Sequence, residues 1–223
     1  PAFDGERTAF AVSDADLISP ATAVKKMFSK TGGVTCRTLH YKGEEETEDE
    51  RVPADALGTA VHLIFEKLDL GSANKAQVEK TAEELCRKGF FSEAVLDVIK
   101  DTFIDGIAAL YRTKAGRELR QSEDVRREFP ITVLVNAEPE EGSDDYTIVH
   151  GIIDAMYRNP DGRWVLIDYK TDINLSCEKV LKENYDGQLR LYAKALEAMG
   201  EQVESCYLYG VRHHDLFKVE KGD

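Results

Sequence analysis

Long apolar runs are missing from the sequence. No stretch approaches the roughly 20 consecutive apolar residues that a transmembrane helix requires, so we expect no membrane partner. The chain shows no secretory signal, no internal repeat, and no low-complexity tract beyond an acidic segment. It begins with Pro1 instead of methionine, which indicates a processed chain or a fragment of a larger protein.

Cysteines are few and scattered. Cys36, Cys86, Cys177 and Cys206 form no C-x-x-C pair, which argues against a zinc or iron–sulfur site. We expect four reduced thiols, because a chain of 223 residues can build a core without covalent staples. A phosphate-binding G-x-x-x-x-G-K-[ST] loop is also missing, which excludes a P-loop motor from this chain.

Positive charge is in short supply. Lysine and arginine number 29 against 42 aspartates and glutamates, a formal net charge of −13. Much of the acidity is concentrated in residues 43–50 and 138–145, where like charges favour solvated loops. A free nucleic-acid binder is usually basic. If the chain binds DNA, we therefore expect weak binding that relies on a partner domain.

Apolar periodicity divides the chain into a helical first half and a strand-rich second half. Helices are predicted near Ser13 and Pro20, then over three later segments with apolar residues at helical spacing. The apolar stripes are Leu57–Leu68, Val78–Leu85 and a long one from Ser92 to Leu110. We interpret 1–223 as a single domain, with an N-terminal helical section and acidic loop (1–56) and a core (57–223).

The second half predicts a mixed sheet. Strands are expected over Glu128–Val135, where Pro130 limits pairing, and over Tyr146–Tyr157, Trp164–Tyr169, Val203–Tyr209 and Leu216–Val219. The turn signal at residues 159–162 joins two of them in a hairpin. A helix over Tyr185–Met199 between two strands indicates a crossover with parallel pairing. The fold class is therefore α/β, a mixed central sheet flanked by helices on both faces.

Asp154, Asp168 and Lys170 form the strongest chemical pattern. Asp168 and Lys170 share one face of a strand, and Asp154 lies on the preceding strand of the hairpin. Two neighbouring carboxylates resist joint ionisation unless a cation lies between them, and Mg²⁺ prefers oxygen ligands. A D-x-K pair is by itself more often a surface ion pair, but the apolar run Val165–Ile167 indicates a buried strand.

Five further residues are informative only in combination with this pattern. His62, on a helix, is either a packed histidine or a third metal ligand, and imidazole would favour Mn²⁺ or Zn²⁺ over Mg²⁺. Gln188 and Tyr192 share a helical face and either support a site or are simple surface polarity. Glu128 is either solvated or holds a second metal or a water. Gly151 allows close backbone approach or marks a bulge.

The ordered motifs Gly58-Thr59-Ala60-Val61-His62, Gly151-Ile152-Ile153-Asp154, Asp168-Tyr169-Lys170-Thr171 and Gln188-Leu189-x-x-Tyr192 resemble a known family. They are similar to the nuclease domain of bacterial AddAB and RecBCD helicase–nucleases, in the PD-(D/E)XK superfamily. The resemblance runs from about Gly58 to Tyr192 and favours the AddA-type subunit, since the scattered cysteines do not match an AddB-type iron–sulfur cluster. Glu128 falls where this family tends to have an acidic residue.

The resemblance implies roles for individual residues. His62, Asp154 and Asp168 would ligate Mg²⁺ or Mn²⁺, with the Tyr169 backbone carbonyl as a further ligand. Lys170 would serve the attacking water. Gln188 and Tyr192 would support the site. The family fold is restriction-endonuclease-like, with a mixed central sheet flanked by helices, and agrees with the independent fold prediction.

Three functional hypotheses follow. The leading one is a Mg²⁺-dependent DNA exonuclease that cleaves single strands during double-strand-break repair and recombination. It would act in the bacterial cytoplasm with a helicase domain of the same polypeptide and an AddB-type subunit. The alternatives are a non-catalytic interaction domain of the same fold within a repair complex, and a metal-dependent phosphohydrolase acting on a small substrate. The missing Gly-rich phosphate cradle argues against the last.

Overall fold

The computed structural model describes residues 11–12, 52–136, 146–171 and 178–219. The helices expected near Ser13 and Pro20, both acidic segments, and two of the cysteines (Cys36 and Cys177) lie outside the described residues. The described cysteines, Cys86 and Cys206, are buried thiols. Among the described helices, none combines the length and apolar character needed to cross a membrane.

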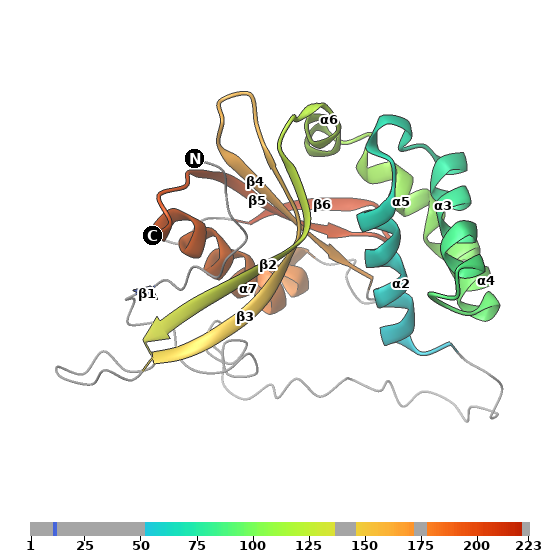
Figure 1. The fold of residues 1–223 in the computed structure, drawn as a ribbon, viewed down its shortest axis with the longest axis horizontal. Helices are drawn as coiled ribbons and strands as arrows, with labels where there is room; N and C mark the ends of the chain where they lie inside the picture. Colours follow the sequence, from blue (N-terminus) through green and yellow to red (C-terminus); the bar gives the residue numbers. More distant parts are fainter. Residues whose placement is uncertain (1–10, 13–51, 137–145, 172–177, 220–223) are drawn as a thin grey trace.

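A six-stranded mixed sheet lies at the centre of the fold, with its strands in chain order (Figure 1). The strands are β1 (Ala11–Val12), β2 (Val125–Asn136), β3 (Tyr146–Arg158), β4 (Trp164–Lys170), β5 (Val203–Gly210) and β6 (Asp215–Val219). The β1–β2 and β4–β5 pairs are parallel, and the other three pairs are antiparallel. The predicted α/β class with a mixed sheet is confirmed.

The hairpin and the crossover that the sequence predicts are both present. Asn159 begins the β3–β4 turn, and its side-chain oxygen accepts hydrogen bonds from the backbone N–H groups of Asp161 and Arg163. Helix α7 (Glu178–Ala198) then links β4 to its parallel neighbour β5. This helix begins earlier than the predicted start at Tyr185. Its amphipathic part covers one face of the sheet (Figure 1).

Five helices and a short 3₁₀ turn cover the opposite face (Figure 1). They are α2 (Ala54–Lys67), η1 (Leu70–Ser72), α3 (Lys75–Arg87), α4 (Glu93–Thr102), α5 (Ile104–Leu110) and α6 (Lys114–Gln121). Asn74 and Ser92 cap α3 and α4 as expected, because each side chain accepts a backbone N–H of the first turn. Helix α6, capped by Thr113, was not predicted.

The expectation of one helix from Ser92 to Leu110 is wrong. Phe103 separates α4 from α5 and is itself fully buried. The break turns Gly106 against the backbone of Val211, so closely that a Cβ on Gly106 would overlap that carbonyl. Tyr209 also donates a hydrogen bond to the Gly106 carbonyl oxygen (2.6 Å). An uninterrupted apolar stripe could not reveal this, because the break serves contacts with a distant strand.

Strand β2 also departs from its prediction. It begins at Val125, before Glu128, and runs through Pro130, which is aligned with Ile152 of β3. Strand β1 pairs with β2 at Leu134 and Val135, so among the described residues β2 has one neighbouring strand at Pro130. A proline is tolerated at a position where no second ladder among these residues requires its missing N–H.

Candidate metal centre

Asp154 lies where β3 and β4 separate. Their paired register begins at Ala155 and Ile167, so Asp154 stands just beyond it. In place of a further backbone pair, Asp154 Oδ2 accepts the Tyr169 backbone N–H at 2.7 Å. Asp154 is only 7% exposed, and this bond holds one carboxylate oxygen while Oδ1 is directed toward His62. As predicted, Asp154 lies close to the strand that carries Asp168 and Lys170.

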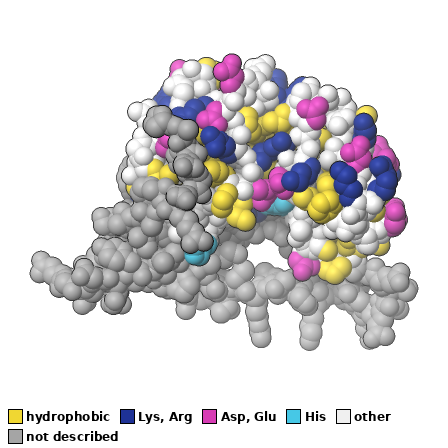
Figure 2. Space-filling model, viewed as in Figure 1, with side chains coloured by type: hydrophobic (Ala, Val, Ile, Leu, Met, Phe, Trp, Pro, Cys, Tyr) yellow, Lys and Arg dark blue, Asp and Glu magenta, His cyan; other side chains and the backbone are white. Residues whose placement is uncertain are grey.

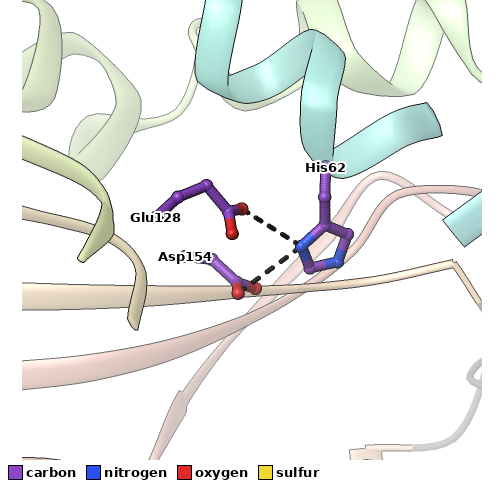
Figure 3. Close-up of side chains that lie close together, drawn as sticks. All are labelled: His62, Glu128 and Asp154. Carbon is purple, nitrogen blue, oxygen red and sulfur yellow. Dashed lines mark ion pairs between the residues drawn. The ribbon is translucent and has the colours of Figure 1, made fainter. Parts of the chain in front are cut away.

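His62 reaches this carboxylate from α2 on the helical side of the sheet. Its Nδ1 lies 3.5 Å from Asp154 Oδ1 and 3.4 Å from Glu128 Oε1 (Figure 3). On the other side of the ring, Nε2–H donates to the Tyr169 carbonyl oxygen at 3.2 Å. Because Tyr169 holds Nε2, Nδ1 is the nitrogen directed toward the two carboxylates. The structure brings His62 beside Asp154, and its role as a metal ligand stays a prediction.

Glu128 is the residue whose place in the site only the structure reveals. Its backbone has φ of +48°, a left-handed conformation that is costly for a residue with a Cβ. The conformation occurs between two paired positions of β2, Arg127 and Phe129. Such strain persists where the surrounding structure enforces it, often at functional sites. The sequence offered an acidic residue at a family position, but solvation was the simpler interpretation.

Asp168 and Lys170 form a close ion pair at the end of β4. Asp168 Oδ2 lies 2.6 Å from Lys170 Nζ, and both side chains are largely shielded from solvent. Burial raises the pKa of Asp168 above its usual range, the Asp154 charge raises it further, and Lys170 opposes both. The predicted alternation is confirmed, since the two residues do meet on one face. The surface-ion-pair alternative is wrong, because Asp168 is only 3% exposed.

His62 is a strong base in this setting. Burial by itself would lower the His62 pKa, but the carboxylates of Asp154 and Glu128 outweigh burial and raise it to about 10. At neutral pH the ring therefore carries a proton that balances part of the carboxylate charge. The proton occupies the role that a metal cation would take among the same oxygens.

Gln188 and Tyr192 meet on α7, where Tyr192 lies against Gly151 of β3. Gln188 Nε2 donates to the Tyr192 hydroxyl at 3.0 Å, and Tyr192 is only 4% exposed. A Cβ on Gly151 would lie 2.6 Å from Tyr192 Cε1, so glycine is needed for this contact. Of the two interpretations of each residue, close approach is confirmed for Gly151, and simple surface polarity is wrong for Tyr192.

The residues of this centre fit a divalent cation. Ligand atoms of His62, Glu128 and Asp154 all lie within 4.8 Å of one another. Glu128 Oε1 and Asp168 Oδ2 are buried, and each faces a cationic group, His62 Nδ1 at 3.4 Å and Lys170 Nζ at 2.6 Å respectively. Carboxylates with one imidazole suit Mg²⁺ or Mn²⁺. On one face of the molecule, acidic side chains and a histidine are exposed together (Figure 2).

Comparison with known proteins agrees with this geometry. Residues 34–220 match the PD-(D/E)XK nuclease superfamily. Because the match covers most of the chain, the chain belongs to that superfamily.

Curated relatives narrow the resemblance further. The chain is similar to the A-subunit of the ATP-dependent helicase/nuclease from three bacteria. Identity is 32% over 161 residues for Thermoanaerobacter sp. (strain X514), covering 68% of this chain and 13% of the relative. For Lactiplantibacillus plantarum (strain ATCC BAA-793 / NCIMB 8826 / WCFS1) the identity is 33% over 162 residues, covering 70% of this chain and 13% of the relative. For Listeria monocytogenes serotype 4b (strain F2365) the identity is 29% over 208 residues, covering 84% of this chain and 16% of the relative. The chain thus spans only a small part of these relatives.

Proposed function

We propose that this chain is a divalent-metal-dependent deoxyribonuclease that hydrolyses phosphodiester bonds in single-stranded DNA. The observation that carries the proposal is the cluster of His62, Glu128 and Asp154 beside the Asp168–Lys170 pair, in a chain of the PD-(D/E)XK superfamily. Mg²⁺ is the preferred ion and Mn²⁺ the alternative, because hard cations take oxygen ligands and imidazole suits Mn²⁺.

In this proposal, some residues hold the cation and others act on the phosphate and the attacking water. His62, Glu128, Asp154 and Asp168 would hold the cation, with the Tyr169 carbonyl either as a further ligand or as the group that orients His62. When bound, a divalent cation supplies Lewis-acid polarisation of a phosphoryl oxygen and activates a water molecule. The buried Asp154–Tyr169 hydrogen bond fixes one ligand in advance, so little reorganisation is needed.

Lys170 is placed to act on the reacting groups. Its ammonium group lies against Asp168 and at the edge of the carboxylate cluster, where it can orient the attacking water or stabilise charge on the phosphoryl oxygens. In the hydrolysis, the water oxygen forms a bond to phosphorus while the bond to the leaving oxygen breaks. One proton of the water is lost, and the leaving oxygen gains one. Tyr192 packs against Gly151 of β3, and Gln188 donates a hydrogen bond to the Tyr192 hydroxyl.

The names of the relatives support a biological setting for this proposed activity. Their name describes one subunit of a helicase/nuclease, and the chain corresponds to 13–16% of their length. We place the chain in the bacterial cytoplasm as an exonuclease domain attached to a helicase, paired with an AddB-type subunit, in double-strand-break repair and recombination. A helicase would deliver single strands to a domain whose net charge of −13 gives it little attraction for DNA of its own.

The direct test is cleavage of a labelled single-stranded oligonucleotide in Mg²⁺. Wild-type cleavage should disappear with EDTA and in Lys170→Ala. Lys67→Ala is the matched control, because Lys67 is half exposed at the end of α2 and pairs with Glu66. If the wild type does not cleave, Mn²⁺ binding measured by calorimetry and lost in Asp154→Asn would indicate a competent centre that needs its helicase. A wild type that neither cleaves nor binds metal would contradict the proposal and favour an interaction domain.

A further inference from the structure

The β2–β3 ribbon changes its facing pattern at the metal centre. Ala155 packs in the core beneath α2–α6, whereas Ile153 packs in the core beneath α7. Residues two apart on a strand normally share a face, so the alternation slips at Asp154. Opposite it, the left-handed Glu128 marks the same irregularity on β2. Beyond this point, Ile153 and Gly151 face α7, and Ile152 and His150 face the other way.

On the other face of the ribbon, several of the described side chains are exposed. Ile152 is 49% exposed and lies opposite Pro130, which is also exposed. Exposed His150 follows, and its Nδ1 is 3.1 Å from Thr132 Oγ1 on the neighbouring strand. Among the described residues, the large hydrophobic side chains that are exposed are Ile152 and Phe90. Phe90 follows α3 in the helical layer, so Ile152 is the one beside the metal centre.

This face is continuous with the catalytic carboxylates. Ile152 lies two residues from Asp154, about 7 Å along the strand, and His150 lies about 14 Å away. A strand that runs along β3 from the centre would bring its neighbouring nucleotides within this range.

We propose that Ile152 and His150, with Pro130, form a base-contacting platform that selects single-stranded substrate. An apolar side chain and an imidazole ring can pack on the faces of unstacked bases, and every base has such a face. In a duplex these faces are stacked inside and cannot be reached. The charge of the chain makes this contact important, because a net charge of −13 offers little phosphate attraction. This inference rests on the proposed nuclease function and names the side chains that contact the bases of its substrate.

Binding of oligonucleotides tests the platform independently of cleavage. Fluorescence anisotropy in Ca²⁺ would compare a single strand carrying bases with an abasic strand of equal length and charge. The wild type should bind the base-carrying strand more tightly. Ile152→Ala should weaken that binding at least about fivefold, and Ile152→Ala with His150→Ala still further, while abasic binding stays unchanged. Phe90→Ala removes the other exposed large hydrophobic side chain of the described residues. It should leave binding of both the base-carrying and the abasic strand unchanged.

The outcomes separate this inference from the nuclease proposal. A base preference lost in Ile152→Ala supports the platform even if the wild type fails to cleave in Mg²⁺. The inference is overturned if the wild type shows no preference for bases, if Ile152→Ala binds like the wild type, or if it weakens abasic binding equally. Cleavage that persists with unchanged single-strand preference in Ile152→Ala would overturn the platform and leave the nuclease proposal intact. Circular dichroism of each variant confirms that it is folded.

Discussion

Gly151 of β3 and Tyr192 of α7 touch so closely that no larger residue fits at position 151. A Cβ built there would lie 2.6 Å from Tyr192 Cε1 and 2.7 Å from Cζ. Gln188 donates to the same tyrosine hydroxyl, and Asp154 lies three residues along β3 from the glycine. The contact therefore sets the distance between α7 and the strand that carries Asp154.

Replacing Gly151 by alanine should push α7 away from the sheet. We expect Gly151→Ala to destabilise the fold by about 1–3 kcal/mol, the usual cost of overpacking, and to weaken metal binding. Urea unfolding and Mn²⁺ calorimetry would measure both effects. Gly58→Ala is the matched control, because its Cβ would meet Thr171 Oγ1 at an ordinary 3.5 Å and alanine favours the helix. A Gly151→Ala protein as stable as Gly58→Ala would contradict this.

Metal binding should release a proton from His62. The His62 pKa of about 10 means that the ring is protonated at pH 7.5, whereas a metal ligand must be neutral. Calorimetric Mn²⁺ titrations in two buffers of different ionisation enthalpy should show release of about one proton. Apparent affinity should rise with pH from 6 to 9. His62→Asn should bind more weakly and release almost none, and equal proton release in the two proteins would sink the assignment.

The same shift predicts how stability depends on pH without metal. A histidine whose pKa is raised in the folded state stabilises the fold fully below its unfolded pKa of about 6.5. This contribution is lost as the pH rises through about 10. The free energy of unfolding of the metal-free chain should therefore fall between pH 7 and 10 more steeply than in His62→Asn. Parallel curves for the two proteins would show that His62 gains nothing from its carboxylate neighbours.

Glu128 allows the carboxylate and the backbone strain to be tested separately. Glu128→Gln and Glu128→Gly both remove the charge beside His62, so both should weaken Mn²⁺ binding by about tenfold or more. Only glycine also relieves the left-handed backbone, so the Gly variant should be more stable than the Gln variant by up to about 1 kcal/mol. Thermal unfolding without metal would measure this difference. A less stable Gly variant would indicate that the conformation carries no strain.

A stability prediction away from the site concerns Glu201. Its Oε2 accepts hydrogen bonds from Trp164 Nε1 (2.9 Å) and from Arg158 (2.8 Å), and Arg158 stacks on the Trp164 ring. Glu201→Ala leaves the buried indole N–H without this acceptor and should cost about 1–3 kcal/mol. Trp164 is the only tryptophan, so its fluorescence reports the change directly. Glu204→Ala, which removes a more exposed partner of Arg163, should cost about 0.5 kcal/mol or less.

Local pattern was enough to predict the hairpin, the crossover helix and most of the site. Alternation placed Asp168 and Lys170 on one face, and the turn at Asn159 brought β3 and Asp154 beside them. The family motifs added His62, which spacing alone would have left as an ordinary helical histidine. These features are predictable because strand alternation, helical periodicity and turn preferences act over a few neighbouring residues.

Other features depend on contacts between segments far apart in the chain. The break at Phe103 exists because Gly106 must meet the backbone beside Val211, and the stripe through Phe103 carries no sign of it. Glu128 joins the centre because its backbone is forced into a left-handed conformation between paired neighbours on β2. Neither hydrophobic period nor residue type predicts such a constraint.

The sequence by itself determined the α/β class, the mixed sheet, and the chemistry available at its centre, because these follow from periodicity and from which side chains are present. Only the tertiary structure decided which nitrogen of His62 faces the carboxylates, how Gly151 seats Tyr192, and that Ile152 is exposed beside Asp154. The physical reason is that burial, ring orientation and the slip in strand alternation are fixed by close packing between elements, which no local window of sequence contains.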